Sequence, residues 1–231
     1  MSGNKIARFD PKTQTFKEWD MPSGHRPHGA LVDKQGMVWT TGNGNGTIGK
    51  LDPASGKVIE YKTPSGRGGP HTLVITDDQR TIWFTMQSGD KVASLDTQSG
   101  AIREYASSGG PYGLSIDKAG NIYVSTDADK TGLLVFDASG RYLKTIAPEF
   151  SGIHGLMIRE ENGKEFIYAA HVKNFVFRRN LPLRAMEWTW PKRAMQFTDL
   201  GSGDQGTGSS VPVHHFAFSR ARANARRASS K

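Results

Sequence analysis

Short runs in which apolar and polar residues alternate recur along the chain, separated by Gly, Pro, Asp and Ser. One group of four such runs occupies residues 30–33, 38–41, 48–52 and 57–62. The runs are rich in β-branched and aromatic residues, and their turn-forming boundaries are typical of β-strands. Because no segment keeps the period of an amphipathic helix, the pattern predicts an all-β chain.

The group of four runs is repeated, and three landmarks mark the repeat. A ring-bearing residue in a Pro-His-Gly type of turn recurs at steps of 43, 41 and 42 residues, at His28, His71, Tyr112 and His154. An aromatic residue recurs in the second run, at Trp39, Trp83, Tyr123 and Tyr168. An aspartate follows the third run, at Asp10, Asp52, Asp96 and Asp137. Three landmarks with one period indicate a repeat protein.

A unit of about 40–45 residues with four strands is the sequence signature of a β-propeller blade. Such sheets bury both faces by stacking around a common axis. Complete units occupy residues 27–63, 70–106, 111–147 and 153–190, and residues 4–19 supply strands three and four of another. The sequence therefore predicts a β-propeller of four-stranded blades with about four and a half repeats, equivalent to an incomplete six- or seven-bladed propeller.

The pattern ends near residue 190, which divides the chain into propeller repeats (1–190) and a basic tail (191–231). The net charge is +8, and +5 of it lies in residues 192–231. The tail lacks apolar periodicity, so we expect it to be irregular and largely disordered. It also lacks interleaved aromatic residues, so we expect no nucleic-acid partner. A natural tail and a truncated or frame-shifted longer propeller both explain it, and the second predicts self-association through open blade faces.

Several classes of protein are excluded by what the sequence lacks. It contains no cysteine, so disulfides, thiolate metal sites and cysteine nucleophiles are absent. No stretch approaches the ~20 apolar residues of a membrane helix, and the N-terminus lacks the apolar core of a signal peptide. We expect a chain with no membrane association that is cytoplasmic as written, with a longer exported parent as the alternative.

The motifs at 26–29, 38–41 and 48–53 resemble those of the streptogramin lyase (virginiamycin B lyase) family. The resemblance is strong over residues 4–147 and weak over 153–190. The later repeats also resemble NHL and gluconolactonase propellers. The resemblance implies a seven-bladed lyase, associated with antibiotic resistance, that opens cyclic depsipeptides of the streptogramin B class by elimination at the ester. It implies Mg²⁺ as cofactor, and we expect no organic cofactor.

The same resemblance assigns roles to residues at the channel mouth, where a small-molecule substrate or ligand is expected to bind. His28 and His71 are the predicted catalytic residues, and Gln87 occupies the metal-binding position. The remaining predicted contacts to substrate are Arg26, Tyr112 and His154. The chain departs from the family pattern at two positions, because Gly69 and Gln87 stand where active members have glutamate.

Three interpretations remain open at the level of sequence, the third being an incomplete gene product with no function of its own. In the first, the protein is a metal-assisted lyase acting on a cyclic ester or lactone. In the second, it is a propeller that binds a ligand or a protein without chemistry, and the histidines order the turns that carry them. His25, one residue before Arg26, is expected to be a solvated loop residue.

Overall fold

The computed structural model describes residues 3–127, 132–148, 152–171 and 175–181. Within these ranges the chain is built from β-strands, and the single helical element is the 3-10 turn Gln87–Gly89. No helix in the described part is long and apolar enough to span a bilayer. The predicted strand at 185–190 and the predicted tail lie outside the described residues.

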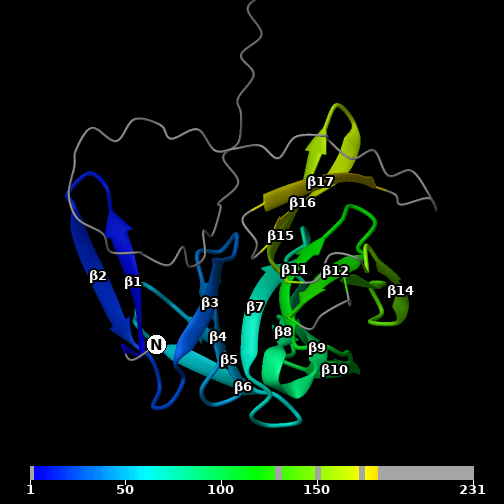
Figure 1. Ribbon diagram of the computed structural model, residues 1–231. Coiled ribbons are helices and arrows are strands. Elements are labelled where there is room, and N and C mark those ends of the chain that lie inside the picture. The colour runs from blue at the N-terminus through cyan, green and yellow to red at the C-terminus, as the bar shows by residue number, and fades with distance from the viewer. Residues whose placement is uncertain (1–2, 128–131, 149–151, 172–174, 182–231) are drawn as a thin grey trace, which may run out of the picture. The chain divides into compact units, whose positions relative to one another are not determined.

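Three four-stranded antiparallel sheets follow one another along the chain, each a simple meander (Figure 1). The first consists of β3 (Pro27–Val32), β4 (Val38–Gly42), β5 (Thr47–Leu51) and β6 (Val58–Lys62). The second consists of β7 (Pro70–Ile75), β8 (Thr81–Met86), β9 (Lys91–Asp96) and β10 (Ile102–Ala106). The third consists of β11 (Pro111–Ile116), β12 (Ile122–Thr126), β13 (Leu133–Phe136) and β14 (Tyr142–Ile146).

Two smaller sheets precede and follow these three in sequence. A hairpin is formed by β1 (Lys5–Asp10) and β2 (Thr15–Asp20). A three-stranded sheet is formed by β15 (Ile153–Glu161), β16 (Lys164–His171) and β17 (Phe175–Leu181). The all-β fold and the four-stranded propeller blade predicted from the repeat are confirmed. Strand one of each unit begins earlier than predicted, because it includes the Pro-His-Gly segment itself.

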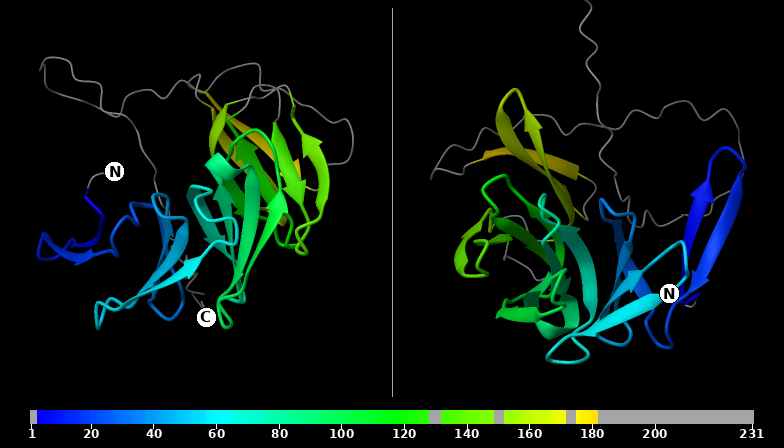
Figure 2. Two further views of the ribbon diagram at one scale, coloured as in Figure 1. Left: turned by 90° about the horizontal axis from the view of Figure 1, so that it is seen from below. Right: turned by 180° about the vertical axis from the view of Figure 1, so that it is seen from behind.

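The first strand of each unit contacts the first strand of the next. Contacts join β3 to β7, β7 to β11 and β11 to β15, and Figure 2 shows these strands from two further sides. The ring-bearing residues at the start of each first strand are therefore carried by neighbouring strands. This placement follows from the repeat, because equivalent residues of adjacent blades occupy equivalent positions.

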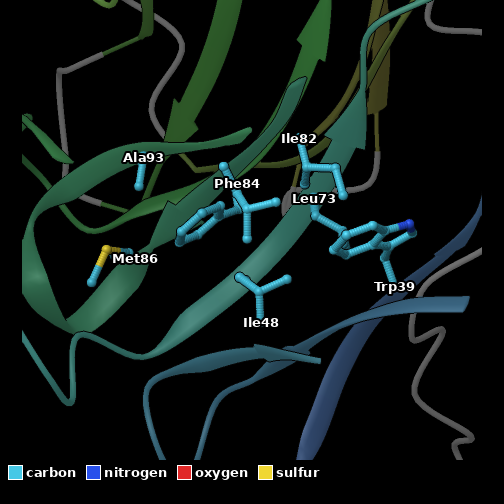
Figure 3. Close-up of a cluster of buried hydrophobic side chains, with 8 residues drawn as sticks. Trp39, Ile48, Leu73, Ile82, Phe84, Met86 and Ala93 are labelled. Atoms are coloured by element: carbon cyan, nitrogen blue, oxygen red, sulfur yellow. The ribbon is translucent and has the colours of Figure 1, made fainter. Parts of the chain in front are cut away.

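The interface between the first two blades is an apolar cluster of buried side chains (Figure 3). Trp39 and Ile48 of the first blade pack against residues of the second that include Leu73, Ile82 and Phe84. Trp39 and Phe84 are fully buried, so truncating either to alanine should cost about 3–5 kcal/mol. The equivalent Trp83 and Tyr123 belong to the clusters at the next two interfaces, so this repeated aromatic residue packs between blades.

Candidate functional site

The first strands of consecutive blades, β3, β7, β11 and β15, are here called the inner strands. Four ring-bearing side chains, one from each, form one continuous row. The centroids of the His28 and His71 rings lie 3.7 Å apart. The ring of His71 lies 4.0 Å from that of Tyr112, and the ring of Tyr112 lies 4.5 Å from that of His154, at an interplanar angle of 30°. The structure thus brings together two predicted catalytic residues and two predicted substrate contacts, which we call the ring row.

A β-bulge follows the first residue of every inner strand and determines where the rings point. The pairing register shifts between Pro27 and Ala30 in the first blade, and between Pro70 and Leu73 in the second. The third and fourth blades shift at the same place. A bulge inserts one extra residue and redirects its side chain. The repeated Pro-His-Gly turn therefore presents one ring from each blade.

A hydroxyl on strand two holds each of the first three bulges. The backbone N–H of Gly29 donates to Thr41 Oγ1 at 2.7 Å, and that of Thr72 donates to Thr85 Oγ1 at 3.1 Å. Thr41 in turn donates to the carbonyl of His71 in the next blade, at 2.7 Å. Thr85 donates in the same way to the carbonyl of Tyr112, at 2.7 Å. In the third blade the backbone N–H of Gly113 donates to Ser125 Oγ at 2.9 Å. These hydroxyls were not predicted, although a Thr or Ser recurs at this position in the first three units, and the fourth has Ala170.

Glycine after the ring residue allows the next blade to approach closely. A Cβ added to Gly29 would lie 2.7 Å from the carbonyl oxygen of His71. A Cβ on Gly113 would lie 2.6 Å from the carbonyl oxygen of His154. The glycines therefore serve the contact between inner strands, which keeps neighbouring rings within stacking distance.

Exposure changes along the ring row. His71 is buried, with 3% of its surface exposed, whereas the His154 side chain is 50% exposed. His28 and Tyr112 are half-buried. Burial raises the pKa of Tyr112, and the charge of Asp127 raises it further. The phenol therefore stays protonated at neutral pH and is able to donate a hydrogen bond.

The prediction that His25 is a solvated loop residue is wrong, because its side chain is fully buried. Its Nδ1 lies 2.9 Å from Glu60 Oε1 and 3.1 Å from Thr47 Oγ1, and its Nε2 lies 2.7 Å from Thr40 Oγ1. Burial lowers the pKa of His25, although Glu60 partly offsets this effect. His25 belongs to the interior of the first blade rather than to the ring row.

Arg26, a predicted substrate contact, adopts a left-handed backbone with φ of 49° and is exposed. Its backbone N–H donates to Asn4 Oδ1 at 2.8 Å. Its side chain runs beside Gly44, where an added Cβ would lie 2.8 Å from Arg26 Cδ. The hydrogen bond ties the start of the first blade to the residue before β1. The substrate-binding role of Arg26 stays a prediction.

Gln87, the predicted metal position, contacts an aspartate that the sequence analysis missed. Gln87 Nε2 donates to Asp127 Oδ2 at 2.5 Å, and Asp127 Oδ1 lies 3.7 Å from His154 Nε2. Asp127 follows Gln87 by 40 residues, so the repeat period alone could have identified it.

The residues present do not fit the Mg²⁺ site that the resemblance implies. Mg²⁺ is bound through carboxylate oxygens, but Gln87 is a neutral amide and Gly69 has no side chain. A carboxylate at Gly69 would also need Ser88 to shift, because an added Cβ lies 2.9 Å from its Oγ. Over the described ranges, no group of three or more His, Asp or Glu side chains is arranged to hold a metal ion.

Comparison with known proteins matches residues 1–134 to the virginiamycin B lyase family. The chain is similar in structure to virginiamycin B lyase from Staphylococcus aureus, with 18% identity and a TM-score of 0.61, over 78% of this chain and 64% of that one. A streptogramin B lyase has 22% identity and a TM-score of 0.59, over 78% and 63% of the two chains.

A gluconolactonase from Xanthomonas campestris is also similar, with 18% identity and a TM-score of 0.59, over 76% of this chain and 65% of that one. At these identities the likeness establishes the fold. The chain spans less than two thirds of the length of each of these three proteins. A search of curated protein sequences finds no match.

Proposed function

The chain belongs to the virginiamycin B lyase family, and from this premise we propose that it opens a cyclic ester or lactone bound against the ring row. The observation that carries the proposal is the 3.7 Å separation of the His28 and His71 rings on adjacent inner strands. Two imidazoles at this spacing supply a proton acceptor beside a second donor or acceptor, which is what acid–base chemistry requires.

In the proposed reaction, an imidazole of the His28–His71 pair removes the acidic proton next to a carbonyl group. The electron pair of that C–H bond forms a carbon–carbon double bond while the neighbouring ester C–O bond breaks. The electrons of the C–O bond leave with the carboxylate, and the proton stays on the imidazole. We expect the Tyr112 hydroxyl to donate a hydrogen bond to the developing negative charge.

A second function, ligand binding without chemistry, is favoured by the composition of the site. Gly69 and Gln87 replace both glutamates of the family pattern, and the reaction above uses neither position. The ring row with its adjacent polar groups would still bind a small molecule. The two functions share one surface and differ in whether bound ligand is converted.

The test is turnover and binding of quinupristin by the full chain. A solved structure holds quinupristin with a catalytically inactive histidine-to-alanine variant of the S. aureus enzyme, which supports its use as a probe. We expect His28→Gln and His71→Gln to lower turnover by roughly 10²–10⁴-fold, the usual contribution of a general acid or base. Because His71 is buried, thermal unfolding of each variant must first show a folded protein.

Tyr112→Phe should lower turnover while Tyr142→Phe, on the exposed strand β14, should not. Turnover that is indifferent to both His28→Gln and His71→Gln would contradict the lyase function. Binding without turnover in the wild-type chain would favour the non-catalytic function instead.

A further inference from the structure

The residue that follows strand two is neutral in the first two blades but is a carboxylate, Asp127, in the third. The residue that follows strand two is Asn43 in the first blade, Gln87 in the second and Asp127 in the third. Asn43 Nδ2 donates to the carbonyl of Pro70 at 3.2 Å, and Gln87 Nε2 donates to Asp127. The first two positions are thus neutral amides that link neighbouring blades, whereas the third is a carboxylate.

In the part of the chain that the structure describes, the charge of Asp127 faces a histidine, His154, rather than a lysine or an arginine. Among the described residues, no Lys or Arg nitrogen lies within 4.0 Å of its carboxylate. Gln87 is neutral, and His154 Nε2, at 3.7 Å from Oδ1, is beyond hydrogen-bond distance. The Asp127 side chain is 35% exposed, so a ligand on the ring row is able to reach it.

The charge acts on the ring row itself. Asp127 contributes, after burial, to raising the pKa of Tyr112, so the carboxylate and the phenol are within electrostatic reach of each other. The Tyr112 and His154 rings are stacked beside it. A carboxylate next to an aromatic ring attracts a bound cation in two ways. The carboxylate attracts it directly, and the negative face of the ring attracts it as well.

We propose that Asp127 forms a cation subsite at the His154 end of the ring row, so that the preferred ligand carries an ammonium group beside its cyclic ester. The inference rests on the proposed function, because it places the ester on the same row. The subsite also disfavours anions. Opening the ester creates a carboxylate, and Asp127 repels that product and promotes its release.

The test compares two probes of similar size, benzylammonium and benzyl alcohol, titrated calorimetrically into the full chain at low ionic strength. The wild-type protein should bind benzylammonium roughly tenfold more tightly, as expected for a charge pair at about 4 Å that is partly shielded from water. Asp127→Asn should bind the two probes equally. Asp52→Asn, which removes a carboxylate from an outer turn, should keep the wild-type preference.

Equal binding of both probes by the wild-type chain would overturn the subsite, and this comparison needs no variant. A preference that survives in Asp127→Asn, or that is lost in Asp52→Asn, would also overturn it. The proposed function fails separately, through absent turnover of quinupristin. A chain that prefers benzylammonium but converts no ester keeps the cation subsite and loses the lyase.

Discussion

Thr41 on β4 donates its hydroxyl hydrogen to the carbonyl oxygen of His71 on β7, at 2.7 Å. Thr41 Oγ1 itself accepts the backbone N–H of Gly29, also at 2.7 Å. One buried hydroxyl therefore ties the bulge that carries His28 to the residue that carries its neighbour in the ring row. The distance between the His28 and His71 rings depends on this link.

Replacing Thr41 by valine should destabilise the protein by about 1–3 kcal/mol, because it leaves the N–H of Gly29 and the carbonyl of His71 without their partner. Urea unfolding followed by circular dichroism measures the change in unfolding free energy. Thr41→Ser keeps the hydroxyl and should keep most of the unfolding free energy that Thr41→Val loses. Thr13→Val, on the exposed β1–β2 turn, is the matched control. Equal stability of Thr41→Val and wild type would show that the link contributes little.

Substituting the glycines after the ring residues should have unequal effects. Gly29→Ala and Gly113→Ala place a methyl group 2.7 and 2.6 Å from a carbonyl oxygen of the next blade. We expect each to cost about 1–3 kcal/mol through overpacking. Gly155 occupies the same repeat position, but no described atom lies within 4 Å of its added Cβ. Thermal unfolding should therefore leave Gly155→Ala close to wild type, and an equal loss at all three would contradict the packing argument.

The stability of the first blade should decrease as the pH falls below about 6.5, because burial lowers the pKa of His25 from that value. Between the unfolded and folded pKa values only the unfolded chain binds the proton. The unfolding free energy then falls by about 1.4 kcal/mol per pH unit. The pKa of Glu60 is also lowered, which adds a loss of the same sign below about 4.5.

His25→Gln removes the titrating group while retaining hydrogen-bonding capacity. Its unfolding free energy should be lower than that of wild type at pH 8 and should change less between pH 7 and pH 5. Urea titrations at a series of pH values measure both slopes. If the two slopes are the same, His25 is not the group responsible.

Gln87→Glu should make the protein respond to divalent cations. The substitution sets a second carboxylate against Asp127, which repels it and lowers the melting temperature in a chelating buffer. Millimolar Ca²⁺ or Mg²⁺ should return the melting temperature to its original value, since both ions bind carboxylate oxygens. The neutral Gln87→Ala variant should show no such recovery. A wild-type chain that is stabilised by Mg²⁺ as strongly as Gln87→Glu would contradict the poor fit of its donor set.

The repeat made most of the fold predictable, because strands, turns and ring residues return with one period. It also placed His28, His71 and Tyr112 on successive inner strands, from which their proximity follows. The bulge did not follow from the pattern, since a single inserted residue leaves the period of the blade unchanged.

Two residues show where the sequence was not sufficient. The burial of His25 depends on Glu60, 35 residues away, and on the space left by Gly42 and Gly49, where an added Cβ would contact the imidazole. Local polarity around His25 gives no sign of this. Asp127 was predictable from its spacing to Gln87, but the family pattern directs attention to the blade before it.

The central claim is that the ring row forms one ligand surface, and imidazole NMR of the ¹⁵N-histidine-labelled full chain tests it most directly. Adding quinupristin should shift the resonances of His28, His71 and His154 at one common ligand concentration. The resonance of His25, enclosed within the first blade, should stay unchanged and serves as the internal control. Shifts that leave out His28 and His71, or that affect His25 equally, would contradict the account.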